Sequence, residues 1–253
     1  MSLPRTSRAG VGLVAAGHFF IDMSVGALPA FLPAFTALWA LSDFKASMLL
    51  GASLLASSVV QPLFGMAADR WSTPVLLWGS VLVAAVGLGA AGLAGSYSVA
   101  FILIVGSGLG VAAYHPEAAR VVTRVSGERS TTGMAWFMVG GHMGFSAGPL
   151  VAAAFVPVLG PEATLVYLVP GLLIAGLLVI FSAQITAPEP RRTAEVRAVD
   201  DGDNHVPGLI LLLGVTTTRT WAQWGFLALM PLFLQDSRGY SDREVGLVVF
   251  LFA

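Results

Sequence analysis

The sequence contains no cysteine and few charged residues, and both absences restrict what the protein can be. Without cysteine, disulfide bonds and thiolate metal sites are excluded. Charged residues make up only 11% of the chain, whereas hydrophobic residues make up 56%. Apolar segments of about 20 residues or more recur, which is the length a helix needs to cross a bilayer. These features exclude a soluble domain, and the unbroken apolar runs exclude a transmembrane barrel, whose strands alternate between apolar and polar residues.

Enzyme signatures are also missing. The chain has no HExxH, GxSxG or Walker motif and no GxGxxG placed after a strand. The glycines Gly106, Gly108 and Gly110 lie inside an apolar run, so we interpret them as helix-packing positions. We therefore expect a protein that is not an enzyme, with no catalytic residue, no cofactor and no nucleic-acid partner, embedded in the lipid bilayer.

The apolar runs predict an all-α polytopic fold with seven complete helices. The first run is too long for a signal-peptide core and is expected to remain as a membrane helix. An eighth helix is predicted to begin near Ser241, where Ser241-x-x-Glu244 forms a capping box. The seven complete helices are predicted at Gly10–Trp39, Phe44–Ala68, Pro74–Gly95, Val99–Val125, Thr131–Leu159, Ala163–Thr186 and Pro207–Leu234.

A polar, charged segment over residues 187–206 divides the chain and predicts a cytoplasmic linker. Weakly similar sequence occurs on both sides of it, with Pro33 before Ser42-Asp43 and Pro231 before Ser241-Asp242. Two six-helix repeats joined by such a linker are typical of transporters. We predict an N-terminal six-helix bundle over residues 1–186 and the start of a second bundle over residues 207–253, so the sequence is expected to be a fragment.

The basic residues predict the orientation in the membrane. With a cytoplasmic N-terminus, nine basic residues face the cytoplasm and three face the other side, as the positive-inside rule requires. We therefore predict a multi-pass protein of the inner (plasma) membrane. The cytoplasmic set is Arg5, Arg8, Arg70, Arg120, Arg124, Arg129, Arg191, Arg192 and Arg197, and the opposite set is Lys45, Arg238 and Arg243.

The first predicted helix carries two ionisable residues deep in its apolar span. His18 and Asp22 are four residues apart and therefore share one face of the helix. One interpretation is a structural hydrogen bond to a neighbouring helix. The other, which we favour, is a proton site, because a carboxylate at this depth is costly and can gain or lose a proton as water access changes.

The fourth predicted helix carries a second group, within GSGLGVAAYHPEAARVVTR at residues 106–124. Tyr114, His115, Glu117 and Arg120 lie there, and such groups usually face a protein interior. The alternative is a helix end at which Glu117 pairs with Arg120 and the arginines reach the headgroups. His115 and Glu117 could also be imagined as metal ligands with His18 and Asp22, but the sequence shows no convergence of three or four ligands, so we expect no metal.

Two further residues are candidates for the cavity. His142 lies among glycines in the fifth predicted helix, where it either bonds a carbonyl of a neighbouring helix or lines a binding cavity. Arg219 lies midway along the seventh and needs a partner. That partner could be Asp22, Glu117, a carbonyl or an anionic substrate. An anionic substrate is an option because a guanidinium can donate two parallel hydrogen bonds to one oxyanion.

Gly65, Asp69 and Arg70 end the second predicted helix and form a glycine–x–x–x–Asp–Arg loop. This loop either packs generically or acts as a conformational latch, in which Asp69 accepts from backbone donors at a helix start. It resembles the signature of the major facilitator superfamily. Trp71-Ser72-Thr73-Pro74 follows here, whereas the family usually has glycine and further basic residues.

Within that superfamily, three stretches resemble the fosmidomycin-resistance group of drug efflux proteins. They are His18-x-x-x-Asp22-x-x-x-Gly26-Ala-Leu-Pro29, then Ala113-Tyr-His-Pro-Glu-Ala-Ala-Arg120, and Arg219 with the later Pro231.

The resemblance implies a bundle of the major facilitator type, normally of twelve helices, and a proton-coupled antiporter. The cargo would be a drug or small anionic compound, such as a phosphonate antibiotic, exported by alternating access. Asp22 would carry the proton and His18 would tune it. The rivals are an intramembrane metal-dependent or acid–base enzyme using the His, Asp and Glu side chains, and a non-transporting scaffold. The expected substrate or cavity residues are Tyr114, His115, Glu117, Arg120, His142 and Arg219.

Overall fold

The computed structural model describes residues 7–70, 74–185, 206–240 and 248, and every regular element within these ranges is helical. The prediction of an all-helical protein is therefore confirmed. The predicted eighth helix from Ser241 and almost all of the predicted linker 187–206 lie outside the described residues. The chain divides into two compact units, Met1–Pro188 and Glu189–Ala253, which are described separately below.

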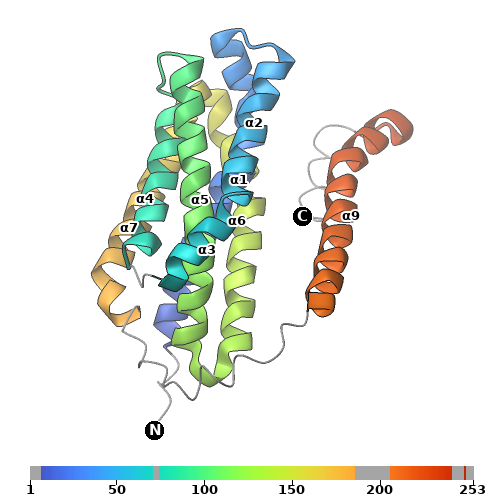
Figure 1. The fold of residues 1–253 in the computed structure, drawn as a ribbon. Coiled ribbons are helices and arrows are strands. Elements are labelled where there is room, and N and C mark those ends of the chain that lie inside the picture. The colour runs from blue at the N-terminus through green and yellow to red at the C-terminus, as the bar shows by residue number, and fades with distance from the viewer. Residues whose placement is uncertain (1–6, 71–73, 186–205, 241–247, 249–253) are drawn as a thin grey trace. The chain divides into compact units, whose positions relative to one another are not determined.

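The first unit is a bundle of long helices joined by short connections (Figure 1). Two 3₁₀ turns, Gly127–Arg129 and Gly160–Thr164, lie between the later helices. The second unit contains α9, Val206–Arg238. The helices of the first unit are α1 Arg8–Trp39, α2 Asp43–Ser58, α3 Gln61–Arg70, α4 Pro74–Ala91, α5 Tyr97–Ser126, α6 Ser130–Leu159 and α7 Leu165–Ile185.

One predicted helix is wrong in detail, because the run Phe44–Ala68 forms two helices. α2 ends at Ser58 and α3 begins at Gln61. Pro62, the second residue of α3, has no N–H to bond the carbonyl of Ser58, and its ring would clash with that carbonyl in a continuous helix. Proline is tolerated in the first turn of a helix, so the chain restarts there.

Three helical stretches among the described residues are long and apolar enough to cross a membrane. They are Arg8–Trp39, Asp43–Ala68 and Tyr97–Ser182, the last of which contains α5, α6 and most of α7. The shorter helix Val75–Ala91 is also apolar. By length and composition, the described helices therefore agree with the prediction of a membrane protein.

Glycines allow α1 and α6 to pack backbone against backbone. A Cβ on Gly144 or Gly148 of α6 would overlap carbonyl oxygens of α1, at Phe19 and Met23 respectively. Gly26 of α1 would in turn overlap the carbonyl of Phe145. Small residues are the usual means of close helix approach in membranes, where dispersion contacts replace the hydrophobic driving force. This seam fixes α1 against α6 at the depth where His18 and Asp22 lie.

Candidate functional site

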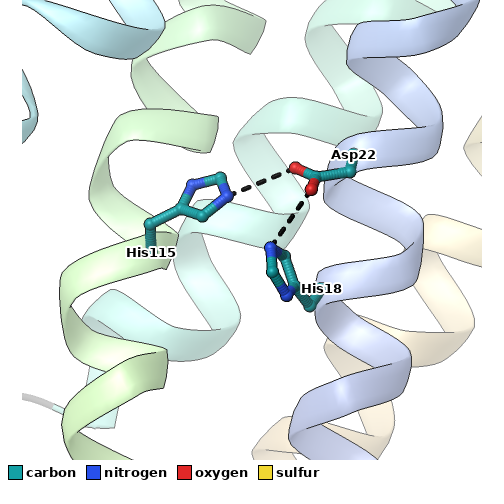
Figure 2. A group of neighbouring side chains, drawn as sticks. All are labelled: His18, Asp22 and His115. Atoms are coloured by element: carbon teal, nitrogen blue, oxygen red, sulfur yellow. Dashed lines mark ion pairs between the residues drawn. The ribbon is translucent and has the colours of Figure 1, made fainter. Parts of the chain in front are cut away.

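His18 and Asp22 of α1 and His115 of α5 form a cluster between these two helices (Figure 2). His18 Nε2 lies 3.1 Å from one carboxylate oxygen of Asp22, one turn along α1. His115 Nε2, on α5, lies 3.2 Å from the other oxygen. One carboxylate thus contacts two imidazoles, and the contact to His115 joins two helices that are far apart in sequence.

The second nitrogen of each imidazole is committed to a backbone carbonyl. His18 Nδ1 donates to the carbonyl of Phe137 on α6 at 2.7 Å, and His115 Nδ1 donates to the carbonyl of Val111 on α5 at 2.8 Å. A carbonyl oxygen can only accept, so each Nδ1 must carry a hydrogen. Each Nε2 is therefore either a bare acceptor facing Asp22 or the second protonated nitrogen of an imidazolium.

This arrangement limits the number of protons in the cluster. Each contact between Nε2 and a carboxylate oxygen is a hydrogen bond only when one proton lies between the two atoms. With no proton in either contact, the three side chains carry a net charge of −1. One proton makes the cluster neutral, and two protons give it a net charge of +1. A low-dielectric interior favours the neutral state, in which one contact is closed and the other places two acceptors face to face. Closing both contacts requires a second proton.

The cluster is closed on one side and accessible on the other. The His18 side chain is only 4% exposed, and its ring stacks on Phe137 with centroids 3.9 Å apart. The side chains of Asp22 and His115 are 21% and 25% exposed. Water therefore reaches the Asp22–His115 contact more easily than it reaches His18.

A pocket of about 440 Å³ adjoins His115 and lies along the break between α2 and α3. Its lining includes the polar residues Ser58 and Gln61, so water can approach the imidazole from this side. The lining residues are Ser58, Gln61, Pro62, Gly65, His115 and Pro116. Gly65 is one of the predicted latch residues. A Cβ at this position would lie 3.8 Å from Pro116, which is an ordinary van der Waals contact.

The two comparisons with known proteins place the chain in a family. The model of the Major Facilitator Superfamily matches residues 14–253. The chain belongs to the Major Facilitator Superfamily. Members of this superfamily are transporters and not enzymes, which agrees with the missing enzyme signatures.

Among curated proteins, the chain is similar to the "Fosmidomycin resistance protein" of Escherichia coli (strain K12). The two are 26% identical over 98% of this chain and 63% of the relative. It is also similar to the "Uncharacterized MFS-type transporter YfnC" of Bacillus subtilis (strain 168), at 25% identity over 58% of this chain and 36% of the relative. The chain thus spans less than two thirds of the length of either relative. The predicted resemblance to the superfamily and to the fosmidomycin-resistance group is confirmed.

Glu117 and Arg120, two of the other predicted site residues, pair with each other and not with the cluster. Glu117, only 1% exposed, binds Arg120 through both carboxylate oxygens, at 2.9 and 2.7 Å. Glu117 is therefore not among the potential ligand atoms that converge. The remaining three do converge, with ligand atoms within 4.8 Å of one another, which the sequence could not show.

Tyr114, one of the predicted cavity residues, holds two helices together. Its side chain is fully buried, and its hydroxyl donates to the carbonyl of Val14 on α1 at 2.6 Å. Gly17 leaves room for this hydroxyl, because a Cβ there would overlap it. Tyr114 therefore fixes α5 to α1 one turn before His18. It directly precedes His115, the α5 residue that contacts Asp22.

Two candidates are not brought to the cluster by the described structure. His142 is exposed on α6, and its predicted bond to a neighbouring carbonyl is not found among the described residues. Arg219 lies on α9 in the second unit, so its pairing with Asp22 or Glu117 stays a prediction. Of the predicted latch, the side chains of Asp69 and Arg70 lie outside the described residues.

Phe137 is the site residue that sequence reasoning missed. It supplies both the carbonyl that accepts from His18 and the ring that stacks on it. A phenylalanine in an apolar helix carries no signal of such a role, and only the packing of α6 on α1 reveals it.

Proposed function

We propose that this chain is the N-terminal six-helix half, with the start of the second half, of a proton-coupled antiporter. The proposed activity is export of a drug or small anionic compound by alternating access. Membership of the superfamily supports transport, and the name of the Escherichia coli relative supports fosmidomycin, a phosphonate, as a first cargo to test. The observation that carries proton coupling is the carboxylate of Asp22 between two imidazoles whose other nitrogens are already used.

In the proposed mechanism, the proton count of the cluster sets the contact between α1 and α5. The His18–Asp22 contact lies within α1, so its closure leaves the helix spacing unchanged. The Asp22–His115 contact crosses from α1 to α5, and it closes only when a proton lies between the two groups. Loss of that proton places two acceptors together and favours separation of the helices, which is the kind of two-state element that alternating access needs.

We place the cargo beside this contact. The pocket next to His115 would hold it, and Glu117–Arg120 would form a charge pair near the inner mouth. From the sequence alone, we keep the prediction that Arg219 binds an anionic cargo. His142, exposed on α6, would face the same cavity. Gly65, Asp69 and Arg70 would act as the latch between conformations. The protein would lie in the inner (plasma) membrane with a cytoplasmic N-terminus, as its basic residues favour.

The direct test is Asp22→Asn in the full-length protein, reconstituted in proteoliposomes with fosmidomycin as the probe. Asparagine keeps the size of the side chain, but one accepting oxygen becomes a donating NH₂ group, and the amide cannot gain or lose a proton. We expect proton-driven export and cargo-induced proton release to be abolished, while membrane insertion is unchanged. Glu162→Gln, at the end of the bundle in a 3₁₀ turn, is the matched control. Undiminished proton-driven export by Asp22→Asn would refute the proposal.

The convergence of three ligand atoms also favours a rival use of the cluster, as a site for a bound metal ion. That hypothesis predicts stoichiometric bound metal in the purified full-length protein, lost in His115→Gln. Metal-free protein that still transports would reject it.

A further inference from the structure

A second pocket, of about 490 Å³, lies where α1 and α6 begin, at the same end of the bundle (Figure 1). Two arginines line it, Arg8 in the first turn of α1 and Arg129 just before α6, together with Thr132 and Trp136. Among the described residues, neither arginine forms an ion pair with a carboxylate. Two arginines that have no carboxylate partner in the described part of the chain therefore line one pocket.

We propose that this pocket binds a tetrahedral phosphate or phosphonate group. Guanidinium groups bind such oxyanions through paired hydrogen bonds, and the hydroxyl of Thr132 adds a donor. Trp136 is 63% exposed, so its apolar face is available to the organic part of the ligand. The ligand is either the head of an anionic lipid, since basic pockets between membrane helices bind such groups, or a free phosphonate or phosphate.

The pocket lies on the face of α1 that leads to the cluster. Arg8, Ala15 and Asp22 follow at intervals of seven residues, which keeps them within about 40° of one another around the helix. Ala15 lines the pocket and is about 10 Å along the helix from Asp22. A free anion bound here would thus lie in line with the proposed proton site, although the inference does not depend on proton coupling.

The experiment uses the purified full-length protein in a neutral detergent. Inorganic phosphate and methylphosphonate are titrated calorimetrically, and retention of phosphatidylglycerol against phosphatidylcholine is measured by native mass spectrometry. We expect Arg8→Gln/Arg129→Gln to weaken binding by roughly tenfold or more. Lys45→Gln, whose side chain lies near the start of α2 at the other end of α1, is the control and should bind normally.

Gly12→Leu keeps the test valid should the double variant fail to fold. A Cβ on Gly12 meets no atom within 4 Å, so a larger side chain there enters the pocket without disturbing packing, and both arginines remain. If these variants lose binding of phosphate or methylphosphonate, the ligand is a free anion. If they lose only the retention of phosphatidylglycerol, the ligand is a lipid. Absence of both kinds of binding in the unmodified protein, or binding unchanged in Gly12→Leu, would overturn the proposal.

Discussion

Gly141 of α6 offers a sharp test of the cluster, because its missing side chain makes room for the His18–Asp22 contact. A Cβ at this position would lie 2.6 Å from His18 Nε2 and 2.7 Å from Asp22 Oδ2, whereas ordinary contact begins at 3.4 Å. Each atom must therefore move by about 0.7–0.8 Å. His18 cannot move freely, since Phe137 holds it by its carbonyl and its ring.

We expect Gly141→Ala to break the His18–Asp22 contact. A hydrogen bond to a charged group contributes about 1.5–3 kcal/mol, so its loss corresponds to roughly a 10- to 100-fold change in proton affinity. Alanine is otherwise favoured over glycine in a helix by about 1 kcal/mol, so α6 itself should form. Proton-driven export of fosmidomycin should therefore fall at least about tenfold at unchanged protein level.

The assay is drug susceptibility of cells making the full-length protein, with cargo-induced proton release measured in proteoliposomes. Gly176→Ala in α7 is the matched control, because a Cβ there meets nothing within 4 Å. Full activity of Gly141→Ala would show that the His18–Asp22 contact is not needed for coupling. Equal loss of membrane-inserted protein in both variants would instead point to a general sensitivity of these helices to added bulk.

Three further substitutions test the frame around the cluster. Tyr114→Phe removes one hydrogen bond to Val14 and should lower the free energy of unfolding by about 1 kcal/mol, measured as a decrease in Tm of the purified protein. Arg120→Met removes the partner that binds both carboxylate oxygens of the buried Glu117 and leaves Arg124 as its remaining cationic neighbour, so it should cost up to about 3–5 kcal/mol. Adding Glu117→Leu to Arg120→Met should restore most of the lost Tm, because two apolar residues replace a buried pair, and a double variant no more stable than Arg120→Met would contradict this.

The helices were largely predictable because each is an apolar run of bilayer length, and membrane helices must satisfy their own backbone groups. The break after Ser58 was missed, although Pro62 carries the signal for it. Hydropathy is averaged over a window, and a short interruption flanked by apolar residues does not lower that average. Local backbone chemistry, here a missing N–H, decides such breaks.

The site divides in the same way into a local part and a non-local part. The His18–Asp22 contact follows from a spacing of four residues in a helix, which sequence alone supplies. The Asp22–His115 contact joins residues 93 positions apart and exists because Tyr114 and the α1–α6 glycine seam fix how α1 packs. The contact that sequence could not reveal is the one that crosses between helices. It is therefore the one through which gain or loss of a proton can alter helix packing, and the coupling we propose depends on it.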